Sequence, residues 1–385
     1  MRCQEGPAGL VSKRRGKPSN RQHGAELKRT AIKHVTECYR DFGPTLAAEK
    51  LQAHHQLTVN KETLRQWMLE AGLWHGKVRR SSPTHQSRTR RPCLGELVQI
   101  DGSPHDWFEG RAPACCLLVF VDDATSRLLH LRFELSETTW GYMTATRSYI
   151  EQYGRPLCFY SDKHGIFRVN QGDEGDSQFG RALRELGIEL ICANSPQAKG
   201  RVERANQTLQ DRLVKELRLR NISTIDEANA YLPEFIADYN RRFAKAPANP
   251  TDCHRKALPE PAVMDVIFSR HSQRKTSKNL ELSYQGMLYQ INTKQPSYAL
   301  RKTFITVCEN QQGNVTLLYH GKALPYSRFQ KAKPNADIVT DKELNERVDD
   351  LIKIDGRNQG HKPAKDHPWK RYQPIVKQQQ QRLTA

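Results

Sequence analysis

Two short apolar runs of this chain each end in an aspartate, and that pattern limits the folds open to it. Residues 97–100 lead into Asp101, and residues 157–161 lead into Asp162. A carboxylate at the end of a buried strand is costly unless a cation neutralises it. A right-handed crossover would place two such parallel strands side by side. We therefore expect an open α/β sheet with both aspartates in one crevice at the strand ends.

A third carboxylate, Glu203, lies on a predicted helix that follows Ser195-Pro196-Gln197. This helix can bring Glu203 beside Asp101 and Asp162. Three carboxylates suit Mg²⁺, which takes hard oxygen ligands, and two ions can clamp the oxygens of an in-line phosphoryl displacement. We predict that the three residues are both catalytic and metal-binding, with two Mg²⁺ ions per site and Mn²⁺ able to substitute. No serine, tyrosine or cysteine stands out as a covalent nucleophile.

Other acidic residues are alternatives for the same roles. Asp122 and Asp123 fall in a turn between two predicted strands, where aspartate is favoured for local hydrogen bonding. Asp173, Glu174 and Asp176 fall in a polar segment that is typical of a solvated loop. We rank both groups below Asp101 and Asp162.

The charge of the chain favours a polyanionic partner. Lys and Arg outnumber Asp and Glu by 61 to 42, a formal net charge of +19. Residues 1–95 hold 19 Lys and Arg against 7 Asp and Glu, so most of the surplus lies in the first quarter. Such an uneven footprint indicates a dedicated DNA-binding segment. Residues 1–24 read as a basic arm whose Arg14 and Arg15 would contact DNA, and residues 76–93 read as a basic linker.

Residues 25–75 show the pattern of a helix-turn-helix domain. Helices are predicted over 26–42, 46–54 and 61–71, with Thr45 capping the second and Asn60 the third. The third helix would present Lys61, Arg65 and Gln66 to a DNA major groove. A plain three-helix bundle is the alternative.

Residues 94–255 carry the order of a ribonuclease-H-like α/β domain. Strands are predicted over 97–101, 114–121, 128–133, 157–161 and 188–192, and a polar turn over 103–110. Helices are predicted over 139–153, 178–186, 225–243 and from the Glu203 segment to about residue 220. On that last helix Lys199, Asn206, Gln207 and Gln210 fall near Glu203 and could hold DNA phosphates or bases. Ordinary solvent-facing residues are an equal alternative.

The remaining sequence predicts a small β-barrel over 275–332 and a basic, partly disordered tail over 333–385. Gln285-Gly286 between two alternating runs is a hairpin signal, and further strands are expected over 304–307 and 315–319. Nine cysteines without a C-x-x-C pair fit neither a disulfide framework nor a zinc knuckle. No apolar stretch is long enough for a membrane span, so we expect a cytoplasmic, nucleoid-associated bacterial protein.

Four motifs together resemble a known family. They are residues 97–110 around Asp101, 120–127, 159–167 around Asp162, and 194–210 around Glu203. They are similar to the integrase-core transposases of bacterial insertion sequences, with most likeness to the ISNCY group, and the resemblance covers residues 7–330. It implies the retroviral-integrase fold and a DDE triad on Asp101, Asp162 and Glu203. It also implies double-stranded DNA partners, namely element ends and target, and a homo-oligomer on DNA.

The chain departs from the family pattern in two ways. The separation of Asp162 from Glu203 is longer than usual, with the surplus in residues 167–177. Relatives usually begin with an additional helix-turn-helix, so we expect this chain to be N-terminally shortened. The competing functions are a catalytically silent DNA-binding relative and a ribonuclease-H-type nuclease. The first would bind DNA without nicking it, and the second would cleave without joining.

Overall fold

A computed structural model describes residues 23–76, 88–168, 175–194, 199–293, 298–330 and 340–354. Arg14, Arg15, Asp173 and Glu174 lie outside the described residues. The chain divides into two compact units, residues 1–273 with 305–323, and residues 274–304 with 324–385. Each unit is described by itself.

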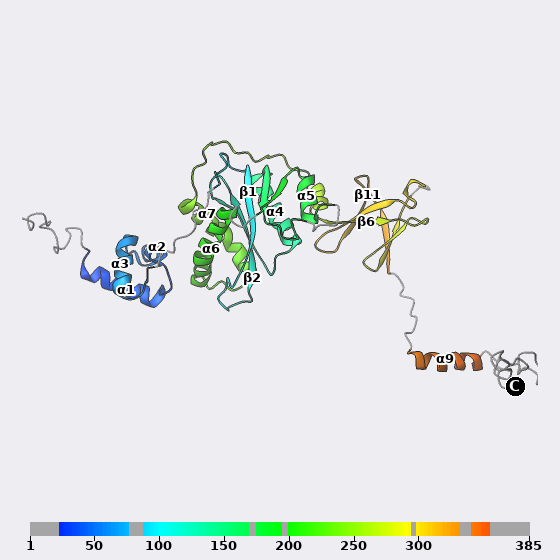
Figure 1. The fold of residues 1–385 in the computed structure, drawn as a ribbon, viewed down its shortest axis with the longest axis horizontal. Helices are drawn as coiled ribbons and strands as arrows, with labels where there is room; N and C mark the ends of the chain where they lie inside the picture. The colour runs from blue at the N-terminus through cyan, green and yellow to red at the C-terminus, as the bar shows by residue number, and fades with distance from the viewer. Residues whose placement is uncertain are drawn as a thin grey trace, which may run out of the picture. The chain divides into compact units, whose positions relative to one another are not determined.

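Three helices form a bundle near the N-terminus, as the sequence predicts, although the first ends at Cys38 and not at residue 42. They are α1 (Ala25–Cys38), α2 (Pro44–His55) and α3 (Lys61–Glu70), packed around a common core (Figure 1). The side chain of Asn60 accepts a hydrogen bond from the Glu62 amide at 2.9 Å, which confirms the predicted cap of α3. The predicted cap of α2 is wrong. Pro44 occupies the first turn and Gly43 is the N-cap, because proline has no amide hydrogen to leave unpaired there.

A five-stranded mixed sheet forms the centre of the first unit, in the order β3-β2-β1-β4-β5. β2 pairs antiparallel with β1 and β3, whereas β4 pairs parallel with β1 and β5. The strands are β1 (Leu97–His105), β2 (Cys115–Asp122), β3 (Leu128–Glu134), β4 (Cys158–Ser161) and β5 (Glu189–Cys192). The meander followed by parallel strands is the order that the sequence predicts, and it makes this a mixed α/β fold.

Helices cover both faces of this sheet, as Figure 1 shows. α4 (Thr139–Tyr153), α5 (Gln178–Glu185) and α8 (Pro261–Ile267) share one hydrophobic core with the sheet, while α6 (Gly200–Leu219) and α7 (Ile225–Phe243) share the other. Alternate residues of β2 enter the two cores, Leu118 and Phe120 into one, Leu117 and Val119 into the other. β2 is therefore buried along its whole length and reads as one continuous apolar run.

β1 is longer than the sequence predicts. The expected turn over 103–110 begins only after His105, which still pairs with Cys115 of β2. Trp107 and Phe108 are fully buried, and the Trp107 indole donates a hydrogen bond to the Ser103 carbonyl at 3.0 Å. These two aromatic anchors hold the end of β1 in the sheet despite its polar sequence.

The later strands form two sheets. β11 (Lys322–Leu324), β10 (Val315–Tyr319), β9 (Phe304–Glu309) and β6 (Arg270–Lys275) make one; β12 (Tyr326–Gln330), β8 (Met287–Ile291) and β7 (Glu281–Tyr284) make the other. Gln285 and Gly286 have φ of 46° and 76°, which confirms the predicted hairpin turn. Among the described strands no closed barrel is recorded, so the predicted barrel is not confirmed. Residues 341–354, inside the tail expected to be partly disordered, form α9 (Asp341–Ile354).

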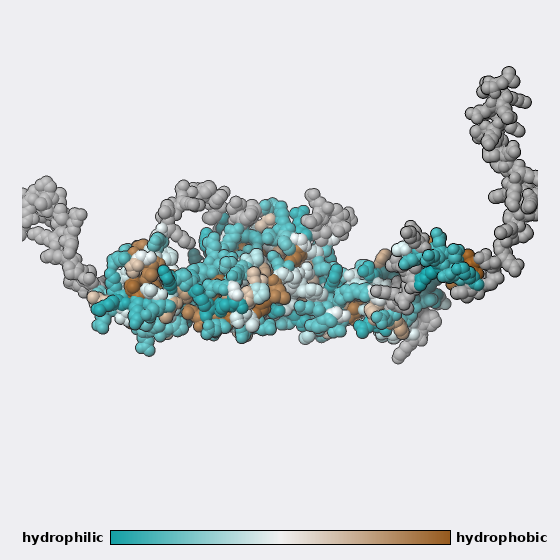
Figure 2. Space-filling view, turned by 90° about the horizontal axis from the view of Figure 1, so that it is seen from below, coloured by the Kyte–Doolittle hydropathy of each residue, from teal (hydrophilic) through white to brown (hydrophobic). Residues whose placement is uncertain are grey.

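The surface of the described residues is largely hydrophilic on the face drawn in Figure 2, in keeping with the charge of the chain. No described helix is long and apolar enough to cross a membrane.

Candidate active site

Asp101 lies inside β1, opposite Val119 of β2, and its side chain is 18% exposed. Burial raises the pKa of this carboxyl group, although Lys199 and Asn206 act in the opposite direction. Asp101 is shielded from solvent because of the place of β1 in the sheet. β1 is covered by helices, so a carboxylate on this strand has little contact with water and must be stabilised by side chains of the protein.

Asp162 follows the last residue of β4, which runs parallel to β1 with Leu97 opposite Cys158 and Gln99 opposite Tyr160. The same register, continued by two residues, brings Asp162 level with Asp101. Oδ1 of Asp162 accepts a hydrogen bond from the His164 amide at 3.0 Å, and the side chain is 48% exposed. The two predicted aspartates therefore lie side by side on neighbouring strands, Asp101 largely shielded from solvent and Asp162 about half exposed.

Lys199 lies between the two aspartates. Its ammonium nitrogen is 2.7 Å from Oδ1 of Asp101 and 3.5 Å from Oδ2 of Asp162, and its side chain is only 7% exposed. Burial acts to lower the pKa of Lys199, but the hydrogen bond and the charge of Asp101 outweigh it, so the pKa is raised. Lys199 is therefore a buried cation held by both carboxylates.

Asn206 completes the surroundings of Asp101. Its amide nitrogen donates a hydrogen bond to Oδ2 of Asp101 at 2.9 Å, so each oxygen of this carboxylate has a donor. Oδ1 of Asn206 is buried, and the described residues offer it no hydrogen-bond donor. A buried acceptor with no donor is costly, and its position beside Asp101 leaves it open to a ligand of the site.

Glu203 is on the same side of α6 as these residues. Positions 199, 203, 206 and 210 follow one another by three or four residues, which places them on one helix face. Gln210 confirms the direction of this face, since its amide nitrogen donates to Ser103 Oγ of β1 at 3.2 Å. Glu203 is half-buried, and no described residue gives it a hydrogen bond or an ion pair. Gln207 is exposed.

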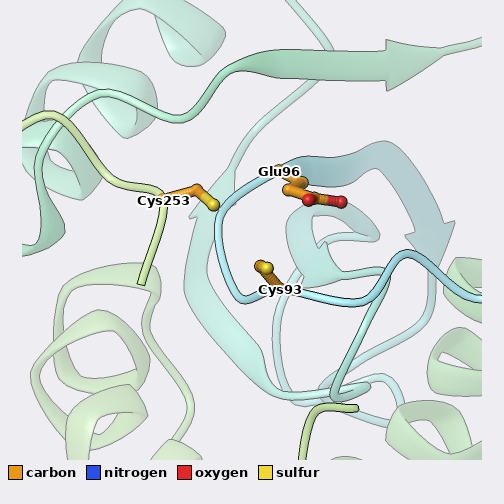
Figure 3. Close-up of side chains that lie close together, drawn as sticks. All are labelled: Cys93, Glu96 and Cys253. Atoms are coloured by element: carbon orange, nitrogen blue, oxygen red, sulfur yellow. The ribbon is translucent and has the colours of Figure 1, made fainter. Parts of the chain in front are cut away.

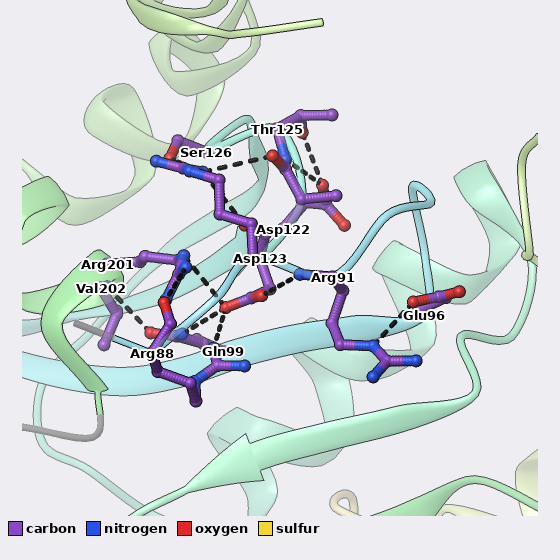
Figure 4. Close-up of polar contacts among 12 residues, drawn as sticks. Arg88, Arg91, Glu96, Gln99, Asp122, Asp123, Thr125, Ser126, Arg201 and Val202 are labelled. Atoms are coloured by element: carbon purple, nitrogen blue, oxygen red, sulfur yellow. Dashed lines mark hydrogen bonds and ion pairs between the residues drawn. The ribbon is translucent and has the colours of Figure 1, made fainter. Parts of the chain in front are cut away.

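A buried hydrogen-bond network holds the first turn of α6 against the sheet (Figure 4). Gln99 of β1 is fully buried; its amide nitrogen donates to Asp123 at 2.8 Å, and its oxygen accepts from the Val202 amide at 3.1 Å. Arg201 forms an ion pair with the same Asp123 carboxylate at 3.2 Å. Sequence analysis missed Gln99. The available signal was a single amide inside the otherwise apolar run 97–100.

The alternative carboxylates have structural partners. Asp122 is fully buried and accepts from the Gly95 amide at 3.0 Å and from the amide and hydroxyl of Thr125 at 2.8 and 2.6 Å. Asp123 is fully buried too, and besides Gln99 and Arg201 it accepts from Arg88 and the Arg91 amide. Asp176 is paired with Arg184 at 2.7 Å. None of these three contacts Asp101 or Asp162 among the described residues.

The predicted DNA-contacting residues of α3 differ in their engagement. Lys61 is exposed. Arg65 donates to both carboxylate oxygens of Glu62, from Nε to Oε2 at 2.9 Å and from Nη2 to Oε1 at 2.6 Å. Gln66 donates to the same Glu62 at 3.3 Å. Of these three side chains, Lys61 is the one for which the structure gives no hydrogen bond or ion pair within α3.

The distal half of α6 binds the N-terminal bundle, a contact that sequence analysis did not predict. Glu49 of α2 accepts from Arg212 at 2.7 Å and pairs with Arg242 of α7 at 3.1 Å. Lys50 pairs with Glu216 at 2.5 Å, with both side chains nearly buried. One helix thus carries Glu203 near its start and the docking site of α1–α3 near its end.

The donor set around Asp101 fits a divalent cation. Lys199 already places a positive charge between Asp101 and Asp162, Glu203 is unengaged among the described residues, and Oδ1 of Asn206 is buried without a donor. The raised pKa of Asp101 shows that one ammonium does not fully offset the burial of this carboxylate. Carboxylate and amide oxygens are the ligands that Mg²⁺ takes.

Comparison with known proteins places the chain in a family. It is 43% identical over 365 residues to "Putative transposase y4bF" of Sinorhizobium fredii, covering 93% of this chain and 79% of that protein. It is 32% identical over 300 residues to the transposase for insertion sequence IS1202 of Streptococcus pneumoniae, covering 74% of this chain and 60% of that protein. No protein-family model matches the chain.

Among solved structures, the catalytic core of the HTLV-2 integrase in complex with magnesium covers 41% of this chain and 94% of its own, at 20% identity and a TM-score of 0.32. A likeness of that size carries no argument, so the family follows from the sequence relatives, above all the Sinorhizobium fredii protein, of which the chain covers 79%. They indicate an enzyme of the polynucleotidyl-transferase type. The chain belongs to the transposases, and the predicted resemblance to insertion-sequence transposases is confirmed.

Proposed function

We propose that this transposase cleaves and joins DNA at Asp101, Asp162 and Glu203, with Mg²⁺ as the cofactor and Mn²⁺ able to replace it. The observation that carries the proposal is the buried Lys199 ammonium shared by Asp101 and Asp162, on the helix that also presents Glu203. Two carboxylates that share a buried ammonium form a position where positive charge is stabilised. The three carboxylates would hold two metal ions.

The reaction has two displacements at phosphorus. In the first, water attacks a phosphodiester at an element end and the 3′ oxygen leaves as a hydroxyl. In the second, that 3′-hydroxyl attacks a target phosphodiester and displaces the 3′ oxygen of the target strand. When bound, the metal ions would neutralise negative charge on the phosphate oxygens and lower the pKa of the attacking water or hydroxyl group. Asp101 and Asp162, set by neighbouring strands, would hold the metal ions against the reacting phosphate.

The residues around the triad are proposed to position DNA. A cation that binds Asp101 and Asp162 would release Lys199 from them, and its ammonium can then contact a backbone phosphate. Asn206, Gln207 and Gln210 extend along the same helix. The bundle α1–α3 is proposed to act as a helix-turn-helix that places Lys61, Arg65 and Gln66 at the DNA major groove. Arg65 would first leave the Glu62 carboxylate and then bind a DNA phosphate. Element ends and target are proposed to be double-stranded DNA. Transposition requires two element ends to be held together, so a homo-oligomer on DNA is proposed as well.

A strand-transfer assay tests this proposal. Purified protein, a duplex with a terminal repeat of the element and a target duplex are incubated with Mg²⁺, and nicked and joined products are separated on denaturing gels. Asp162→Asn should abolish both products and leave DNA binding intact. Asp176→Asn is the matched control, an exposed aspartate paired with Arg184 away from the site.

The outcomes separate the competing functions. Joined product lost in Asp162→Asn supports the triad, and activity surviving that change refutes it. DNA binding by the unaltered protein without any nicking would support the silent relative. Cleavage that is never accompanied by joining would support a ribonuclease-H-type nuclease.

A further inference from the structure

Two cysteines that are far apart in the sequence meet beside the start of β1, the middle strand of the central sheet. Cys93 precedes β1, and Cys253 lies in the segment between α7 and α8. The Leu94 carbonyl accepts a hydrogen bond from the Cys253 amide at 2.8 Å, and Leu94 and Asp252 form a parallel bridge. The backbone pairing of these two segments therefore brings both thiols to the same place, where Glu96 adds a carboxylate.

The three side chains are arranged as ligands. One ligand atom from each of Cys93, Cys253 and Glu96 lies within 4.8 Å of the other two. Figure 3 shows the three side chains close together where the two segments meet. Tetrahedral ligands that each lie about 2.3 Å from a zinc ion are about 3.8 Å apart. A small closing movement would thus bring all three into contact with one ion.

Two of the three side chains, Cys93 and Glu96, are shielded from solvent. Cys93 is 6% exposed. Glu96 is 14% exposed and also accepts a hydrogen bond from Arg91 at 2.8 Å; the Arg91 side chain is 54% exposed and can turn to solvent. His254 is close in sequence but does not compete, since its ring nitrogens are bound to Asp252 and Tyr149.

We propose that Cys93, Cys253 and Glu96 bind one zinc ion, with water as the fourth ligand. Two thiolates and a carboxylate select a soft or borderline divalent ion over Mg²⁺. The site is separate from Asp101 and Asp162. Its effect would be structural, because it ties the start of β1 to the segment that follows α7 and so closes a long loop of chain.

Cobalt substitution tests this proposal in the full chain. Zinc is removed from the purified protein under reducing conditions, and Co²⁺ is titrated while the thiolate-to-cobalt charge-transfer absorption is followed. The unaltered chain should bind about one Co²⁺ with that absorption, and added Zn²⁺ should displace it. The measurement is made in the Asp162→Asn variant as well, because only thiolate ligands give this band and the carboxylate triad does not.

Three variants locate the site. Cys253→Ser should abolish the charge-transfer band, and Glu96→Gln, which keeps both thiols, should weaken Co²⁺ binding on the order of 10- to 100-fold. Cys158→Ser is the matched control, because its thiol lies beside the cluster, hydrogen-bonded to the Glu96 carbonyl at 3.1 Å, yet is not one of the three ligands. It should bind as the unaltered chain does.

The proposal fails if the band is absent from the unaltered chain or survives Cys253→Ser. It also fails if peptide mapping of the protein as purified finds Cys93 and Cys253 joined by a disulfide. If Cys253→Ser does not fold, Glu96→Gln still decides, since unchanged affinity in that variant refutes the site. None of these readouts depends on strand transfer, so failure here and failure of the proposed function are distinguishable.

Discussion

The ammonium of Lys199 lies 2.7 Å from Asp101 and 3.5 Å from Asp162, so one buried side chain links the middle of β1 to the end of β4, its parallel neighbour in the sheet. Without such a cation the two carboxylates would repel each other across the crevice. Lys199 therefore stabilises the arrangement that a metal ion requires, and it competes with that ion for the same oxygens.

Lys199→Gln should tighten Mg²⁺ binding and lower the stability of the metal-free protein. Removing one partner of a buried ion pair costs about 3 kcal/mol, and the competing charge disappears with it. Isothermal titration without DNA should show a several-fold lower Kd for Mg²⁺, and urea unfolding a lower free energy of unfolding. Lys163→Gln, an exposed lysine next to Asp162, is the control. An unchanged Kd in Lys199→Gln would mean that Lys199 does not occupy the cation position.

Gln99→Leu should impair strand transfer more than DNA binding. The change removes both hydrogen bonds by which Gln99 ties Asp123 to the first turn of α6, and leaving buried polar groups unpaired costs roughly 1–3 kcal/mol. The readout is kcat together with the Mg²⁺ concentration for half-maximal activity, which should rise as Glu203 loses its position. Asn229→Leu is matched, because Asn229 also bridges a helix and a strand by two hydrogen bonds, to Phe133. Equal changes in both variants would show a loss of stability alone.

Glu49→Gln should weaken the contact between the N-terminal bundle and α6. It leaves Arg212 and Arg242 without their shared carboxylate, and because Glu49 is 22% exposed the cost should be about 1–2 kcal/mol, below that of a fully buried pair. Urea unfolding followed by tryptophan fluorescence should shift to a lower midpoint or split into two transitions. Glu62→Gln removes only the exposed partner of Arg65 within α3 and should leave the curve unchanged. A single unshifted transition in Glu49→Gln would contradict this contact.

His130 should make the folded protein less stable as the pH falls from 6.5 towards 4. Burial, with a smaller effect of Arg132, lowers the pKa of His130 to about 4. In the unfolded chain His130 binds a proton near pH 6.5, whereas in the folded chain it stays neutral until about pH 4. The contribution of neutral His130 to the free energy of unfolding is therefore complete above pH 6.5 and declines below it, by up to roughly 3 kcal/mol. The slope of the free energy of unfolding against pH should be smaller in His130→Gln. Because the carboxylates are the same in both proteins, the difference between the two slopes reports on His130. Parallel slopes would show that His130 is not buried in its neutral form.

Much of the fold was predictable because its signals are local. The bounds of α4 and α7 agree with the predicted helices, since apolar periodicity and an N-cap threonine mark both starts. The predicted end of β1 was wrong because Trp107 and Phe108 are buried by residues distant in the chain. The β-barrel was not confirmed, since strand pairing between distant segments has no local signal.

The sequence alone determined which residues are candidates for a catalytic carboxylate set, because aspartates that follow apolar runs and a glutamate in a polar helix are local patterns. It also determined the excess of positive charge and the order of strands and helices. Only the tertiary structure decided that Lys199 and Asn206 bind Asp101, that Gln99 holds the start of α6, and that Cys93 meets Cys253. Each of these contacts joins segments far apart in the chain, and burial, which gives such contacts their strength, exists only after the sheet and helices have packed.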